Sequence, residues 1–209
     1  MNAKSLDGAI ASISRIVTEN RDYHIELDQQ NGDGDLGIYM AIGFKAVSDY
    51  LSAAEEKDLG KLLMESSAIL NETAPSSSGT ILSIGIMGMV KVLKGKEEAS
   101  LEEITTAMEA GIANIMEKAK SKPGEKTILD ALCPAIDALK IYDTQDGIDV
   151  WAKAAEAAAK GSENTRNMKS VHGRAAYYGE KSIGILDGGS VVGKFIFEGI
   201  KASLGAAPK

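Results

Sequence analysis

Three aspartates lie close together in a glycine-rich segment near the start of the chain. Asp28, Asp33 and Asp35 fall within the segment 28–37, which contains too much glycine to be a helix. Neighbouring carboxylates repel one another unless a cation lies among them, and hard oxygen ligands suit Mg²⁺ or Ca²⁺. Asn-Gly and Asp-Gly pairs are also ordinary turn residues. The segment is therefore a candidate metal site or, as the alternative, a solvated acidic turn.

Three common motifs overlap the glycine-rich parts of the chain, and none of them fits. The glycine spacing in 28–37 matches the dinucleotide fingerprint, but aspartates at its variable positions would face the pyrophosphate. The same segment begins like a calcium loop, yet Leu36 stands at the required glycine and Ile42 at the closing glutamate. Residues 188–194 copy most of a P-loop, but Phe195 replaces the Ser or Thr that holds magnesium.

Three further segments interrupt the helical pattern of the chain. Residues 75–80 precede an apolar helix and combine small hydroxyls with a glycine, which makes either an anion cradle or a plain N-cap. Residues 122–127 are explained by a turn followed by a capping box of Thr127 and Asp130. Residues 173–189 form a long glycine-punctuated loop that carries Arg174, and such loops are usually functional or disordered.

The two histidines and the single cysteine have no partner spacing typical of a catalytic or metal site. We expect His24 and His172 to be ordinary surface or loop histidines, although the position of His172 beside Arg174 could bring it to a site. Cys133 falls within the apolar pattern of a helix and is expected to be a small core residue.

Apolar residues recur at helical spacing along most of the chain. The spacing predicts helices near 4–20, 38–51, 59–70, 80–93, 104–116, 129–139, 151–159 and 189–204. The helix over 80–93 carries few charges and is expected to be central and buried, while 23–27 is the one candidate strand. Successive helices on short loops pack antiparallel, so we expect an all-α, up-and-down bundle of about eight helices, with residues 1–209 as a single domain.

Composition limits the class of function. The chain has 209 residues and a net charge of −7, which argues against nucleic acid or an anionic membrane as the main partner. One cysteine excludes a disulfide framework and fits a reducing compartment. No apolar run approaches the ~20 residues of a membrane span, and the first residues lack the apolar stretch of a signal peptide. A cytoplasmic protein is expected.

Taken in order, the interrupted segments resemble a known family, the ADP-binding L subunit of phosphotransferase-system-dependent dihydroxyacetone kinase. The resemblance covers nearly the whole chain. The residues that carry it are the three aspartates with Gly37 and Met40, Ser78-Gly79, the sequence PGEKTILD over 123–130, GRAAYYGEKSIG over 173–184, and Asp187.

The resemblance implies an eight-helix antiparallel barrel that holds ADP at one end through two Mg²⁺ ions. It implies that Asp28, Asp33 and Asp35 bind the ions, and that Arg174 is the catalytic arginine facing the terminal phosphate. The implied nucleotide-binding residues are Leu36, Gly37, Ile38, Tyr39, Ser77, Ser78, Gly79, Thr127, Arg174, Asp187, Gly188 and Gly189.

In this family, bound ADP receives a phosphoryl group from a phosphohistidine of a sugar-transport-system (PTS) protein and passes it to dihydroxyacetone on a separate K subunit. The resemblance thus implies a dihydroxyacetone (glycerone) kinase subunit of glycerol metabolism, with ADP/ATP as a bound coenzyme. This chain has Leu36 and Tyr39 where the family usually has His and Asn, and Gly188 where Pro is common. The alternatives are a paralogue acting on another short ketose, or a non-catalytic regulatory subunit. A homodimer is also compatible with this reading.

Overall fold

The computed structural model describes residues 1–142 and 149–205, and within these ranges every regular element is helical. The α-helices are α1 (Ala3–Glu19), α2 (Arg21–Asp28), α3 (Leu36–Ala53), α4 (Leu59–Thr73), α5 (Ser77–Leu93), α6 (Leu101–Ala119), α7 (Leu129–Tyr142), α8 (Val150–Asn164) and α9 (Gly188–Gly205). Two 3₁₀ segments, η1 (Thr165–Asn167) and η2 (Arg174–Ser182), lie between α8 and α9.

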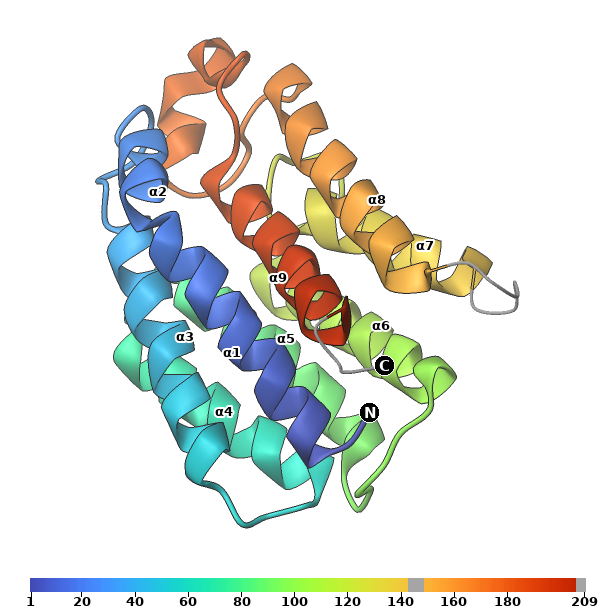
Figure 1. Ribbon diagram of the computed structural model, residues 1–209. Coiled ribbons are helices and arrows are strands. Elements are labelled where there is room, and N and C mark those ends of the chain that lie inside the picture. Colours follow the sequence, from blue (N-terminus) through green and yellow to red (C-terminus); the bar gives the residue numbers. More distant parts are fainter. Residues whose placement is uncertain (143–148, 206–209) are drawn as a thin grey trace.

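In the described part of the chain, the eight long helices form a closed ring, and each packs against the next (Figure 1). The short helix α2 is not a member of this ring, because α1 packs directly against α3. The ring closes where α9 packs against α1. The all-α, antiparallel barrel prediction is confirmed. In Figure 1, α2 and the segment between α8 and α9 lie at one end of this ring, opposite the N-terminus.

The candidate strand over 23–27 is wrong, because these residues belong to α2. Asn20 separates α2 from α1, and its side-chain amide donates a hydrogen bond to the Ile16 carbonyl. His24 and Leu27, three residues apart, are both buried on one face of α2. That spacing is the helical one, and it was hidden in a segment of only eight residues.

The core follows the inner faces of the helices. The larger cluster joins side chains of α1, α3, α4, α5, α6 and α9, and includes the fully buried Met40 and Leu62. A second cluster joins α7, α8 and α9, where small residues such as Ala154 and Ala158 allow close helix contact around Phe197. Burial of this apolar surface is the main force that closes the ring.

Helix α5 differs from the expectation of a central, buried helix. It is one member of the ring, and it leaves Met87 41% exposed. Gly85 and Gly88 on α5 allow α6 to approach so closely that an added Cβ at Gly88 would lie 2.5 Å from the Ala110 carbonyl oxygen. The apolar residues of α5 are therefore shared between two neighbouring helices and the outer surface.

Several helix ends carry the caps that the sequence indicates. Ser100 and Glu103 form a capping box at the start of α6, a pair with the Ser-x-x-Glu spacing typical of this motif, and Ser76 caps α5 through the Gly79 N–H. Among the described residues, no helix combines the length and apolar character needed to cross a membrane.

Candidate functional site

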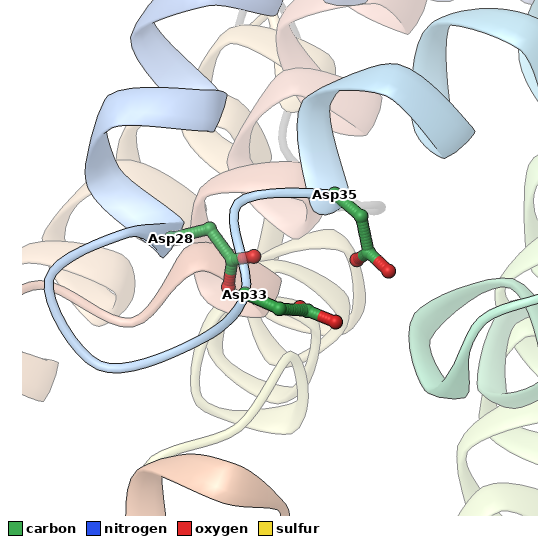
Figure 2. A group of neighbouring side chains, drawn as sticks. All are labelled: Asp28, Asp33 and Asp35. Carbon is green, nitrogen blue, oxygen red and sulfur yellow. The ribbon is translucent and has the colours of Figure 1, made fainter.

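The three aspartates of the acidic loop, residues 28–35, converge on one small space. Asp28 ends α2, Asp33 lies in the connecting turn, and Asp35 directly precedes α3. One carboxylate oxygen from each lies within 4.8 Å of the other two. Figure 2 shows the three side chains around the loop, with Asp28 at the end of α2, Asp33 in the loop and Asp35 at the start of α3. This arrangement offers hard oxygen ligands to a divalent cation, so the donor set fits Mg²⁺ or Ca²⁺.

The local fold of the acidic loop depends on its glycines. The Asp28 carboxylate accepts a hydrogen bond from the Gly34 N–H at 2.8 Å, and the Asp28 carbonyl accepts one from the Gly32 N–H at 2.6 Å. Gly34 has φ +79°, a left-handed conformation that suits glycine. A Cβ at Gly32 would lie 2.8 Å from Asp28 Cγ. The turn chemistry is thus the means by which the carboxylates are brought together.

The electrostatics of the acidic loop favour a bound cation. Desolvation, followed by the charge of Asp28, raises the pKa of the Asp35 carboxyl above its ordinary value. Asp33 is in an ion pair with Arg174, which comes from the far end of the chain. A divalent cation among the carboxylates would offset the repulsion that raises the Asp35 pKa.

A pocket of about 1020 Å³ adjoins the acidic loop and joins all four interrupted segments. Most of the predicted site residues line it. These are Asp28, Asp33, Asp35, Leu36, Ser77, Ser78, Thr127, Arg174, Asp187, Gly188 and Gly189. Gly37, Ile38, Tyr39 and Gly79 lie just beyond, in the first turns of α3 and α5, and do not line the pocket. Their role in nucleotide binding stays a prediction.

Three helices begin at the pocket wall. Leu36, Ser77 and Gly188 are the first residues of α3, α5 and α9, and all three line the pocket. The first N–H groups of a helix lack intrahelical acceptors and carry partial positive charge, which suits an anion. For residues 75–80, the N-cap and the anion-cradle readings are therefore compatible.

Two first residues of these helices are also in direct contact. An added Cβ at Gly188 would lie 2.5 Å from Leu36 Cδ2, so the absence of a side chain at Gly188 leaves room for Leu36. Leu36 is only 6% exposed. Two of the three positions that depart from the pattern of the resembling family, Leu36 and Gly188, thus form one apolar contact between the first residues of α3 and α9.

Apolar side chains also line the pocket and form an apolar wall, which local sequence patterns did not indicate. Ile81 and Ile84 of α5, Ile115 of α6 and Val192 of α9 contribute to it. Their helical spacing had indicated core positions only. The start of α5 and the end of α6 line the same pocket as the acidic loop, and only this tertiary arrangement gives their apolar side chains a place in the site.

Asp187 and Asp130 hold the backbone at the remaining edge. Burial raises the pKa of Asp187 to about 7, and its carboxylate accepts a hydrogen bond from the Ser190 N–H at 2.6 Å, which caps α9. Asp130 accepts from the N–H groups of Gly124 and Thr127 at 2.6 and 2.7 Å. Only one half of the predicted capping box is present. The Asp130 carboxylate accepts from the Thr127 N–H, but the Thr127 hydroxyl accepts from the Leu129 N–H and not from the Asp130 N–H.

The turn and cap over 122–127 account for its local sequence, but they gave no sign of the long-range contacts that Lys126 makes. Lys126 is 3% exposed, and its ammonium donates hydrogen bonds to the carbonyls of Met168, Ser182 and Ile185. Burial lowers the pKa of Lys126. Its acceptors lie 42 to 59 residues further along the chain, so no local pattern could have pointed to them.

The histidines differ from one another. His172 is a loop residue that lines the pocket, as its position beside Arg174 suggested, and its Nε2 lies 2.6 Å from a Glu125 carboxylate oxygen. The expectation of a surface or loop position for His24 is wrong, because its side chain is fully buried on α2 beside Phe195. Cys133 is partly buried, and burial raises the pKa of its thiol to about 11.

Comparison with known proteins finds relatives that include an ADP-binding kinase subunit and a kinase. Residues 30–202 match the DAK2 domain family. The chain is 33% identical, over 87% of its length and 86% of the relative's, to the ADP-binding subunit DhaL of PEP-dependent dihydroxyacetone kinase 1 from Listeria innocua. It is 27% identical, over 97% of its length and 35% of the relative's, to L-erythrulose kinase from Pectobacterium atrosepticum.

A solved structure has a similar fold. The dihydroxyacetone kinase of C. freundii, determined in complex with AMP-PNP and Mg²⁺, superposes with a TM-score of 0.76 at 22% identity. The similarity covers 97% of this chain and 34% of that kinase.

Proposed function

The chain belongs to the DAK2 domain family, and on this basis we propose that it is the ADP-binding subunit of a PEP-dependent dihydroxyacetone kinase. It carries ADP or ATP as a bound coenzyme together with Mg²⁺. The bound ADP accepts a phosphoryl group from a PTS phosphohistidine protein and donates it to dihydroxyacetone on a separate K subunit. The observation that carries the proposal is the single pocket that joins three carboxylates, Arg174 and the beginnings of three helices.

Phosphoryl transfer requires charge neutralisation and alignment more than covalent help from the protein. Asp28, Asp33 and Asp35 would hold Mg²⁺, which when bound neutralises phosphate charge, and two ions are proposed as in the resembling family. Arg174 adds a fixed positive charge at the same edge. The first N–H groups of α3, α5 and α9 offer donors to phosphate oxygens. The apolar wall suits the flat face of a purine.

The remaining parts of the proposal concern the setting of this domain. We propose that residues 1–209 act as a single nucleotide-binding domain in the cytoplasm. The ketone substrate is then supplied by the K subunit and the phosphoryl group by the PTS protein. A homodimer stays a prediction.

The decisive experiment identifies what the native protein carries. Protein purified without added nucleotide is denatured, and the released small molecules are identified by mass spectrometry. We expect about one adenine nucleotide to be released per chain. We also expect that the emptied protein binds ADP again only when Mg²⁺ is present. Protein that releases no nucleotide and also binds none with Mg²⁺ would contradict the proposal.

A second candidate function rests on Leu36, which gives the phosphate side of the pocket an apolar residue. Such a subunit could bind nucleotide yet serve another short ketose, as the L-erythrulose kinase relative does, or regulate a partner without transfer. A transfer assay with a phosphorylated PTS protein and a K subunit, using dihydroxyacetone and erythrulose, separates the cases. Turnover with erythrulose alone identifies the paralogue, and bound nucleotide without turnover identifies the silent subunit.

A further inference from the structure

Two adjacent residues before α7 hold the loop that carries Arg174. This Arg174 loop, residues 168–185, crosses the edge of the pocket between α8 and α9. The Lys126 ammonium lies beneath it and donates to Met168 O at 3.2 Å, Ser182 O at 2.5 Å and Ile185 O at 2.6 Å. Glu125 approaches the same loop through the 2.6 Å contact with His172. The two side chains therefore contact the loop on both sides of Arg174.

Hydrogen bonds connect the two ends of the Arg174 loop to each other. The Arg166 guanidinium donates to the Gly184 carbonyl at 3.0 Å, and the Gly184 N–H donates to the Arg166 carbonyl at 2.8 Å. The Ser170 N–H donates to the Ser182 hydroxyl at 2.9 Å. These bonds connect only the two ends of the loop to each other. They therefore do not determine the position of the loop relative to the rest of the pocket. The contacts of Glu125 and Lys126 do connect it to the segment before α7.

Lys126 makes its contacts in a buried and constrained setting. Its side chain is 3% exposed, and its backbone has φ +62°, a left-handed conformation that is unusual for a residue with a side chain. Buried carbonyls that lose their donors are strongly unfavourable, and hydrogen bonds from a charged donor are stronger than neutral ones. Lys126 thus contributes three of the contacts that connect the Arg174 loop to the segment before α7, beside the one from Glu125.

The same geometry argues against direct phosphate binding by Lys126. An ammonium group has three hydrogens to donate, and three backbone carbonyls accept from it. No donor is left for a ligand. Arg174, by contrast, is exposed on the loop and reaches Asp33 of the acidic loop.

We propose that Lys126, assisted by Glu125, is a positioning residue of the nucleotide site, which fixes the Arg174 loop so that Arg174 faces the acidic loop. The inference rests on the proposed function, because its effect is exerted on a bound nucleotide. Lys126 acts through the loop backbone, and Arg174 is the residue that meets the ligand.

The test compares Lys126→Met with Lys181→Met, a matched change at an exposed lysine of the same loop. Mg²⁺-ADP affinity is measured by calorimetry well below the unfolding temperature, and loop mobility by hydrogen exchange. We expect Lys126→Met to weaken Mg²⁺-ADP binding about tenfold or more and to speed exchange over 168–185, with Lys181→Met close to wild type. A purely structural role would lower the unfolding temperature without changing the affinity.

A double-mutant cycle with Arg174→Ala tests whether Lys126 acts through Arg174. We expect Lys126→Met to cause less than about a twofold further loss of affinity in the Arg174→Ala background. A further tenfold loss in that background would overturn the proposal, as would wild-type affinity in Lys126→Met. If Lys126→Met does not fold, the cycle is run with Glu125→Ala. We expect Glu125→Ala to lower the Mg²⁺-ADP affinity about threefold in the wild-type background and to have no further effect in the Arg174→Ala background. Unchanged affinity in Glu125→Ala would then overturn the proposal.

These results can be told apart from a failure of the proposed function. Wild-type protein that binds no Mg²⁺-ADP would overturn the proposed function and, with it, the role of the loop. If wild-type protein binds Mg²⁺-ADP and Lys126→Met binds it equally tightly, only the positioning role is overturned.

Discussion

Single charged residues decide which ligand the pocket can accept. Asp28, Asp33 and Asp35 provide negative charge at one edge, while Arg174 provides an exposed positive charge beside Asp33. The buried Lys126 differs from these, because its charge is satisfied by backbone carbonyls. Anionic phosphate can therefore approach the carboxylates only with a cation between them.

The first prediction concerns Asp33, the aspartate that pairs with Arg174. Asp33→Asn removes one anionic ligand, so we expect Mg²⁺-dependent ADP binding to weaken by about tenfold or more, roughly 1.4 kcal/mol. The helical circular-dichroism spectrum should not change, because Asp33 lies in an exposed turn. Asp49→Asn, at an exposed aspartate on α3 that pairs with Lys45, is the control. Equal ADP affinity in the two variants would remove Asp33 from the metal site.

The second prediction concerns the pH dependence caused by His24. Desolvation, followed by the charge of Lys194, lowers the folded-state pKa of His24 from 6.5 to about 4, and neither ring nitrogen has a hydrogen-bond partner within the described structure. The unfolded chain therefore binds a proton at His24 more readily than the folded chain does. The stability that neutral His24 contributes is present above pH 6.5 and is lost as the pH falls towards 4.

Urea unfolding at pH 7 and pH 5 measures this effect. Between these values, His24 should cause a loss of about 2 kcal/mol in the free energy of unfolding. His24→Leu keeps an apolar group beside Phe195 and should lose correspondingly less over the same interval. If the two proteins lose the same free energy between pH 7 and pH 5, His24 is not the responsible group.

At the scale of helices, close approach is what places the helix ends around the pocket. Gly88 on α5 lies against the backbone of Ala110 and Gly111 on α6, with an added Cβ only 2.5 to 2.9 Å from their atoms. The contact holds α5 and α6 together, and the pocket lies between the start of α5 and the end of α6.

The third prediction compares two helical glycines. Gly88→Ala should lower the free energy of unfolding by about 1–3 kcal/mol, because the methyl group meets backbone that cannot rotate away. Gly8→Ala on α1 is the matched substitution, since no atom lies within 4 Å of the added Cβ there. It should raise stability by roughly 0.5–1 kcal/mol through the better helix propensity of alanine. Chemical unfolding of both variants checks the opposite signs.

At the scale of the whole molecule, the ring of helices joins segments that are distant in sequence. The acidic loop, the start of α5, the turn before α7 and the Arg174 loop meet at one pocket. A ligand that contacts all of them is bound only when the ring is closed, so its binding should stabilise the whole fold.

The fourth prediction is a nucleotide-dependent and metal-dependent thermal shift. ADP with Mg²⁺ at a hundred times its dissociation constant should add about 3 kcal/mol to stability, which raises the unfolding temperature by about 5–10 °C. EDTA should abolish the shift, because the acidic loop would then repel the phosphates. The same shift with ADP in EDTA would show that the carboxylates hold no metal for the nucleotide.

The sequence by itself determined the eight long helices, several of their caps, the all-α class and the family, but it missed the short helix α2. The four interrupted segments could be recognised because spacing and turn chemistry are local properties of the chain. Most of the proposed site residues then followed from the resemblance to a family, and the pocket now brings most of them together.

Only the tertiary structure decided which side chains are buried against distant parts of the chain. Lys126 looked like part of a simple turn, and His24 looked like a surface residue or part of a strand. Both are buried by segments far along the chain: Lys126 by carbonyls of the Arg174 loop, and His24 beside Phe195 of α9. Local patterns cannot encode such contacts, because the partners are brought together only when the last helix closes the ring against the first.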